Sequence, residues 1–92
     1  MKTIVRSTQD WEAEIGQRIK ATRKERKLTQ QELAERSNVS RSAIKYLEAG
    51  HGSSLATFLN VSRALGLDRG LEEIFSTVST ISPLALLAAK RR

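Results

Sequence analysis

The 92-residue chain is long enough for one small domain, and the core of such a domain is marginal and often helped by a partner subunit. Sixteen Lys and Arg residues against ten Asp and Glu residues give a net charge of +6. This charge indicates a polyanionic partner, because each neutralised phosphate releases condensed counterions. The sequence contains no cysteine, which excludes a disulfide framework, a thiolate metal site and a cysteine nucleophile.

The N-terminal residues 1–10 are expected to form an arm, in which Thr3-Ile4-Val5 is a short β-prone patch. Ser7, with Asp10 three residues later, can cap a first helix that runs to about Glu25. The buried stripe of this helix is expected to comprise Trp11, Ile15, Ile19 and Thr22, with Leu28 closing the corner. The apolar run near the N-terminus is too short for a signal peptide, and no segment approaches membrane-spanning length. We therefore expect a soluble, cytoplasmic protein without a membrane partner.

A second helix is predicted to begin after Thr29, which can form a capping box with Glu32. Leu33 and Ala34 then face inward. The pattern breaks at residues 37–40, where Asn38 can adopt the left-handed conformation that a turn after a helix needs.

A third helix is predicted from Arg41 to Ala49, with Ser40 as its cap and Gly50 as its stop. Ile44 and Leu47 recur at helical spacing. The polar side chains, which fall mostly on another face, are Arg41, Ser42, Lys45 and Tyr46. Two short helices joined by a tight turn form a helix-turn-helix, whose free polar face fits a major groove. The alternative is an ordinary helical hairpin with a polar surface.

Two further helices are predicted, one from about Leu55 to Gly66 and a short one that Asp68 caps. The apolar face of the fourth helix is expected to comprise Leu55, Phe58, Leu59, Val61, Ser62 and Leu65. Leu71, Ile74 and Phe75 are expected to close the core over the helix pair. The prediction for residues 11–75 is therefore a compact, all-helical domain of five helices.

The tail, residues 76–92, is treated separately. Ser76–Ile81 is rich in β-branched residues and is expected to be extended, and Ser82-Pro83 then introduces a short helix over Leu84–Ala89. One hypothesis pairs Thr3-Ile4-Val5 with Thr77-Val78-Ser79 as short β-strands, and the alternative is two frayed termini. A further hypothesis makes the tail a dimerisation or partner-binding segment.

Three stretches between Ile15 and Phe75 carry a family resemblance: IGQRIKATRKERKLTQQELA, NVSRSAIKYLEAG and LATFLNVSRALGL followed by LEEIF. In these stretches, which span about two-thirds of the chain, the sequence resembles the Cro/repressor (Xre-type) helix-turn-helix family of phage and bacterial regulators. The resemblance implies a Cro/repressor-like fold that binds double-stranded DNA.

The resemblance also implies roles for individual residues. Gln30 stands where relatives place a glutamine against a DNA phosphate, and Arg23 and Glu48 stand where phage relatives form an internal ion pair. Arg41, Ser42 and Tyr46 occupy positions that read base edges, and Lys45 lies between them facing phosphate or base. Tyr46 departs from the glutamine of some relatives, and its ring is expected either to touch a thymine methyl or only to pack. The fork of an arginine matches the O6 and N7 acceptors of guanine, which favours Arg41 as the main base contact. The remaining residues expected at DNA are Thr29, Ser40 and Ser53.

Catalysis is disfavoured, because the sequence contains no nucleophile elbow, phosphate-cradling glycine loop or histidine pair. A metal site at His51 is disfavoured as well, since no second histidine or cysteine exists to share it, and no cofactor is expected. Two functional classes remain. The first is a homodimeric repressor that reads a palindromic operator. The second is a protein-interaction module, either without specific DNA binding or as a HipB-like antitoxin that binds a toxin protein and represses its own operon.

Overall fold

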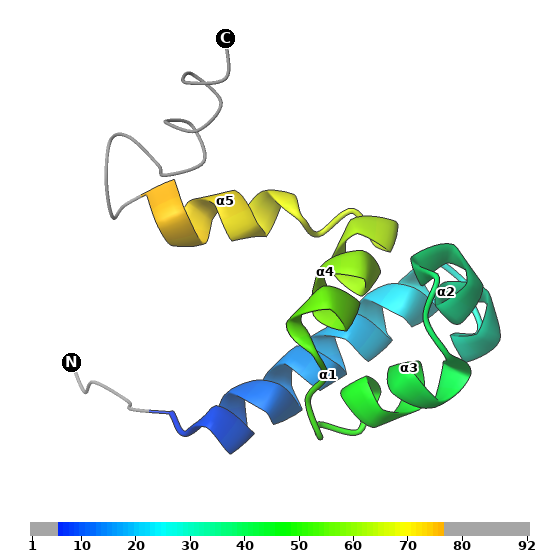
Figure 1. Ribbon diagram of the computed structural model, residues 1–92, viewed down its shortest axis with the longest axis horizontal. Coiled ribbons are helices and arrows are strands. Elements are labelled where there is room, and N and C mark those ends of the chain that lie inside the picture. Colours follow the sequence, from blue (N-terminus) through cyan, green and yellow to red (C-terminus); the bar gives the residue numbers. More distant parts are fainter. Residues whose placement is uncertain (1–5, 77–92) are drawn as a thin grey trace, which may run out of the picture.

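The computed structural model describes residues 6–76, and this part of the chain is all-helical, as predicted. It contains the helices α1 (Thr8–Glu25), α2 (Gln30–Ser37), α3 (Arg41–Glu48), α4 (Leu55–Ala64) and α5 (Arg69–Ser76) (Figure 1). The predicted terminal β-strands and C-terminal helix lie outside the described residues. None of the five helices is long and apolar enough to cross a membrane.

Side-chain caps set the starts of the first two helices. The Ser7 hydroxyl accepts from the Asp10 amide (3.0 Å) and the Asp10 carboxylate accepts from the Ser7 amide (3.2 Å), so α1 begins at Thr8, inside the segment expected as an arm. Thr29 and Glu32 form the same reciprocal box at the start of α2, at 3.0 and 2.8 Å. The Thr29 amide that donates to the Glu32 carboxylate lowers the pKa of Glu32.

The turn between α2 and α3 has the predicted geometry. Asn38 adopts φ 56° and ψ 44°, the left-handed conformation that ends α2. The Val39 amide then donates to the Ala34 carbonyl (3.0 Å), and the Ser40 hydroxyl caps α3 by accepting from the Ala43 amide (3.0 Å). The turn therefore gives a carbonyl in the last turn of α2 and an amide in the first turn of α3 a local hydrogen-bond partner.

The core lies where α2 packs against α3 and α4, and α1 packs against α3. Its buried apolar residues are Ile19, Leu28, Leu33, Ala34, Ile44, Leu47, Val61 and Leu65. Ile15, Val39 and Phe58 pack against this cluster from its edge. In the helix pair of the motif, α3 thus packs on α1, and α2 packs on α4.

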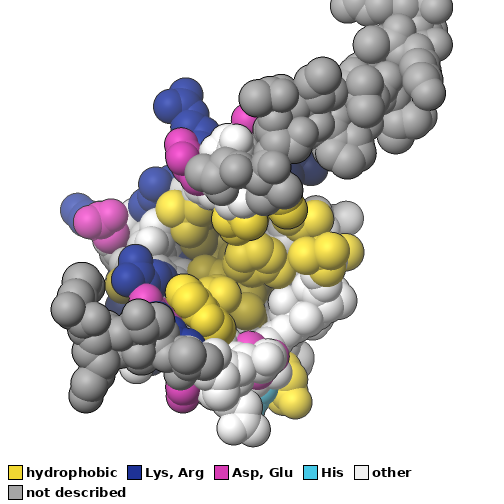
Figure 2. All heavy atoms as spheres, turned by 90° about the vertical axis from the view of Figure 1, so that its left-hand side faces the viewer, with side chains coloured by type: hydrophobic (Ala, Val, Ile, Leu, Met, Phe, Trp, Pro, Cys, Tyr) yellow, Lys and Arg dark blue, Asp and Glu magenta, His cyan; other side chains and the backbone are white. Residues whose placement is uncertain are grey.

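Several residues expected in the core are exposed. Trp11 is 50% exposed because it precedes the part of α1 that α3 covers, and its ring instead faces the Arg6 guanidinium at 4.7 Å. Leu55 opens α4 at the surface, with 71% of its area exposed. Ile74 and Phe75 were expected to close the core, but α5 extends away from the motif and leaves them 58% and 65% exposed. Figure 2 shows apolar side chains gathered on the face between the start of α1 and α5.

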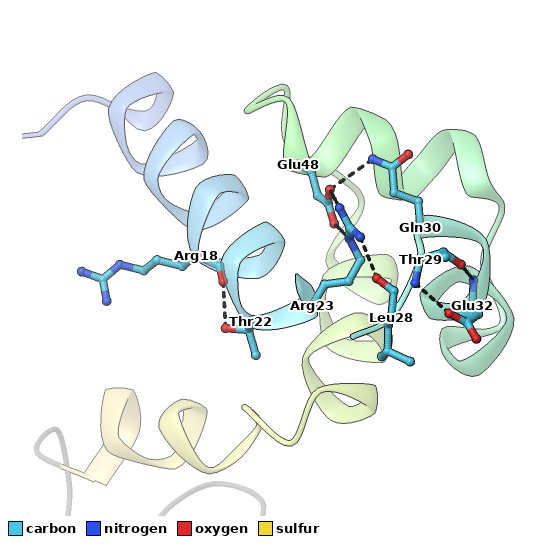
Figure 3. A network of polar contacts seen from close by, with 8 residues as sticks. All are labelled: Arg18, Thr22, Arg23, Leu28, Thr29, Gln30, Glu32 and Glu48. Carbon is cyan, nitrogen blue, oxygen red and sulfur yellow. Dashed lines mark hydrogen bonds and ion pairs between the residues drawn. The ribbon is translucent and has the colours of Figure 1, made fainter. Parts of the chain in front are cut away.

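A buried ion pair ties α1 to the end of α3. The Arg23 guanidinium donates to both carboxylate oxygens of Glu48, from Nε at 2.6 Å and from Nη2 at 3.0 Å (Figure 3). Its Nη1 donates to the Leu28 carbonyl at 2.7 Å, and Gln30 Nε2 donates to Glu48 Oε1 at 3.1 Å. Arg23 and Glu48 are only 7% and 8% exposed, so almost all of both charged groups is removed from water. Each charge therefore depends on the other for compensation.

A second constraint is the close approach of the backbones of α1 and α3 at Gly16. A methyl group at this position would overlap the Leu47 carbonyl oxygen and would lie 3.1 Å from the Glu48 carbonyl oxygen. Both obstacles are backbone atoms of α3, which cannot rotate away as a side chain can. Gly16 therefore allows the two helices to pack at their observed separation.

We expect Gly16→Ala to lower the free energy of unfolding by about 1–3 kcal/mol, because α3 must shift to admit the methyl group. Urea denaturation followed by circular dichroism measures the loss. Gly70→Ala is the matched control: nothing lies within 4 Å of the added methyl group, and alanine is the better helix former, so this variant should lose no stability. Equal unfolding midpoints for Gly16→Ala and the wild type would contradict the packing argument.

We expect Glu48→Ala to lower the free energy of unfolding by about 3–5 kcal/mol, because it leaves the buried Arg23 charge without its partner. Thermal denaturation measures this loss. The double variant Arg23→Met with Glu48→Leu should recover most of the stability, since both charges are then removed. Arg18→Ala breaks an exposed pair with Glu14 and should have a much smaller effect. A Glu48→Ala variant no less stable than Arg18→Ala would show that the buried pair does not hold the helices.

Candidate nucleic-acid interface

The outer face of α3 carries four exposed side chains, while its underside is fixed in the core. The exposed residues are Arg41, Ser42, Lys45 and Tyr46. Ile44, Leu47 and Glu48 are buried on the opposite side, where the ion pair and the Gly16 contact hold them. An eight-residue α-helix is about 12 Å long, a size that a major groove admits. The face therefore presents two cations, a hydroxyl and an aromatic ring on a rigid support.

The starts of α2 and α3 bring further polar groups to the motif, each with an internal partner. The hydroxyl oxygens of Thr29 and Ser40 accept from the amides of Glu32 and Ala43. A hydroxyl that accepts in a cap still has its own hydrogen to donate. Gln30 is half-buried and uses one amide hydrogen on Glu48, so its second amide hydrogen and its carbonyl oxygen are free of that bond. These three groups can therefore donate to an anion without breaking the internal bonds.

The connection between α3 and α4 forms one wall of a surface hollow of about 600 Å³. The hollow is lined by Glu12, Ser40, Ser42, Ala43, Tyr46, His51, Gly52, Ser53, Ser54 and Thr57. Ser53 lines it but directs its hydroxyl hydrogen to the Ser54 carbonyl (2.8 Å), so in this arrangement the Ser53 hydroxyl has no hydrogen to offer a phosphate. The Ser54 hydroxyl caps α4 by accepting from the Thr57 amide (3.0 Å).

Sequence reasoning missed the contact between Tyr46 and His51. Their ring centroids lie 4.9 Å apart with planes inclined by 38°. The two residues are five positions apart and separated by the helix end at Ala49 and Gly50, so helical periodicity does not predict their contact. The signal was present only in the glycine on each side of His51, which indicated an unusual backbone path.

The positive charges near the motif do not all have the same role. Arg23 is buried against Glu48, and Arg18 forms an exposed pair with Glu14. Desolvation raises the pKa of Glu14, but hydrogen bonds and charge from Arg18 and Arg6 outweigh it and lower the pKa overall.

Within residues 6–76, no group of three or more His, Cys, Asp or Glu side chains is placed to hold a metal ion. On the outer face of α3 the charged side chains are the cations Arg41 and Lys45, and the carboxylate of Glu12 lines the hollow beside it.

Comparisons with known proteins agree with this geometry. A family model described as helix-turn-helix matches residues 19–71, which include α2, α3 and α4 whole. The immunity repressor protein of Bacillus phage phi105 is 54% identical over 54 residues, which are 58% of this chain and 38% of that protein. The chain thus covers less than half the length of this relative. The match over more than half of the chain shows its family: it belongs to the Cro/repressor (Xre-type) helix-turn-helix proteins.

Proposed function

We propose that this protein is a sequence-specific, double-stranded DNA-binding transcriptional repressor that inserts α3 into a major groove. The observation that carries the proposal is the exposed row Arg41, Ser42, Lys45 and Tyr46 on a helix whose underside is immobilised by a buried ion pair. Base readout requires side chains at fixed positions, and a rigid support provides them without a further ordering step. The net charge of +6 supports a polyanionic partner.

In this proposal the residues divide between reading and positioning. Arg41, at the first turn of α3, donates two parallel hydrogen bonds to guanine O6 and N7. Ser42 and Tyr46 meet neighbouring base edges, and Lys45 meets a phosphate. Gln30 donates its second amide hydrogen to a phosphate while the first stays on Glu48. Thr29 and Ser40 donate their hydroxyl hydrogens to phosphates of the DNA backbone. Ser53 does so only after its hydroxyl turns away from the Ser54 carbonyl.

The proposed repressor acts as a homodimer on a palindromic operator. The support for this part is the apolar surface at α5, where Ile74 and Phe75 are exposed on the last described helix. Contiguous apolar surface of this kind marks interaction sites in soluble proteins. A twofold axis would present two copies of α3 about 34 Å apart, one turn of B-DNA.

The immunity repressor of phage phi105 supports transcriptional repression, a role that the antitoxin hypothesis shares. That relative is named as a repressor, and the shared segment contains the proposed reading helix. The antitoxin hypothesis depended mainly on the tail, which lies outside the described residues.

Selection of preferred duplexes from random DNA at physiological salt tests the proposal. We expect enrichment of a palindrome whose half-site centres are about 10 base pairs apart. Enrichment of one unpaired half-site would support reading by α3 but contradict the dimer. Failure to enrich any sequence would overturn the proposed function.

For Arg41→Ala we expect binding to the selected duplex to weaken by about 5- to 150-fold, and the preference for guanine at one position to disappear. Fluorescence anisotropy on duplexes carrying each of the four base pairs at that position measures both effects. Arg63→Ala removes the same charge from the end of α4 and is the matched control. Equal weakening on all four duplexes would mean that Arg41 contacts phosphate instead.

For Lys45→Ala we expect weaker binding to every duplex, with a plot of log affinity against log salt concentration that is shallower by about 0.9. The reason is that one phosphate contact, and its released counterion, is lost. Anisotropy titrations between roughly 50 and 200 mM salt give the slope. Arg63→Ala should leave the slope unchanged. An unchanged slope for Lys45→Ala, together with altered base preference, would assign Lys45 to a base edge.

A further inference from the structure

Tyr46 lies on the reading face of α3 and is 58% exposed. An exposed aromatic side chain on a helix surface normally samples several rotamers. Here the ring is in contact with the imidazole of His51 at 4.9 Å, on the side toward the α3–α4 connection. The Tyr46 ring is thus exposed on the reading face but supported on one side by the His51 ring.

The backbone around His51 fixes this support. Gly50 and Gly52 have φ values of +88° and +84°, which L side chains rarely adopt, and both glycines pack against α1. A methyl group at Gly50 would lie 3.1 Å from the Ala13 Cα atom, and one at Gly52 would meet the Glu12 carboxylate. The His51 amide also donates to the Tyr46 carbonyl at 3.1 Å. His51 is therefore held beside Tyr46 by its own backbone, although its side chain is exposed.

From this geometry we infer that Tyr46 determines specificity for thymine by contacting its C5-methyl group, and that His51 is the positioning residue that holds the Tyr46 ring for this contact. The inference rests on the proposed function, and it concerns one position of the site that α3 reads. Among the four bases, only thymine presents an apolar group in the major groove, and an aromatic ring is the one large apolar surface on this face of α3. A methyl contact has no directional hydrogen bond to orient the ring, so the orientation must come from the protein.

The experiment uses the whole chain and the duplex recovered by selection. Each thymine is replaced in turn by 2′-deoxyuridine, which keeps base pairing and removes only the methyl group. For the wild type we expect one thymine position in each half-site, the two related by symmetry, at which the replacement weakens binding. The expected loss of affinity is about fourfold per half-site, which is the effect of burying one carbon. Tyr46→Ala should bind the thymine and deoxyuridine duplexes equally well.

His51→Ala should reduce that thymine-to-deoxyuridine ratio to less than twofold, although His51 itself touches no base. His51→Phe should restore it, since a second aromatic ring can support Tyr46 in the same way. Tyr46→Phe should also retain the ratio, because the contact does not use the hydroxyl. The guanine preference conferred by Arg41 should be the same in all four variants. Circular dichroism melting checks that the variants fold. Because Tyr46 and His51 are exposed, their substitution should leave the melting temperature unchanged.

Several outcomes would overturn the inference while leaving the proposed function intact. The first is a recovered site in which no replacement of thymine by deoxyuridine weakens binding. The second is a His51→Ala variant whose thymine-to-deoxyuridine ratio is undiminished. The third is a His51→Ala variant that binds both duplexes equally more weakly, which would make His51 a phosphate contact. Failure of the selection itself would instead overturn the proposed function. The two failures are therefore distinguishable.

Discussion

The buried carboxylate of Glu48 connects the parts of this domain that the proposed function requires. It compensates the Arg23 charge from α1, accepts from Gln30 at the start of α2, and belongs to the last residue of α3. Arg23 extends the same network to the Leu28 carbonyl, in the connection from α1 to α2. One ionised group thus fixes three helices relative to each other. A buried ion pair is a weak source of net stability, but it specifies a unique arrangement when all its hydrogen bonds are made.

Local signals predicted the helices well, because capping is local chemistry. Ser7, Thr29 and Ser40, which were predicted as caps, each accept from an amide three residues later, and Asn38 takes the left-handed turn. The pairing of Arg23 with Glu48, 25 residues apart, is a long-range contact that came only from the family resemblance. Periodicity alone assigns no partner to a charged residue.

The sequence failed where burial depends on what a helix packs against. Leu71, Ile74 and Phe75 have the spacing of a core-facing stripe, yet periodicity gives the apolar side of a helix and not the element that covers it. Trp11 and Leu55 were wrongly predicted to be buried for the same reason. Each lies in the first turn of its helix, where the neighbouring helices do not cover it. Within the reading face, the support of Tyr46 by His51 depends on backbone torsion angles that no periodic pattern encodes.

Gly16 has a consequence that concerns distance rather than stability. Because it has no side chain, the backbone of α3 lies directly against the backbone of α1, and the separation of these two helices is set there. A bulkier residue would act as a spacer and tilt or lift α3, changing how deep its side chains enter a groove. If α3 binds DNA as proposed, Gly16 thus sets how far the side chains of α3 reach into the groove without contacting DNA itself.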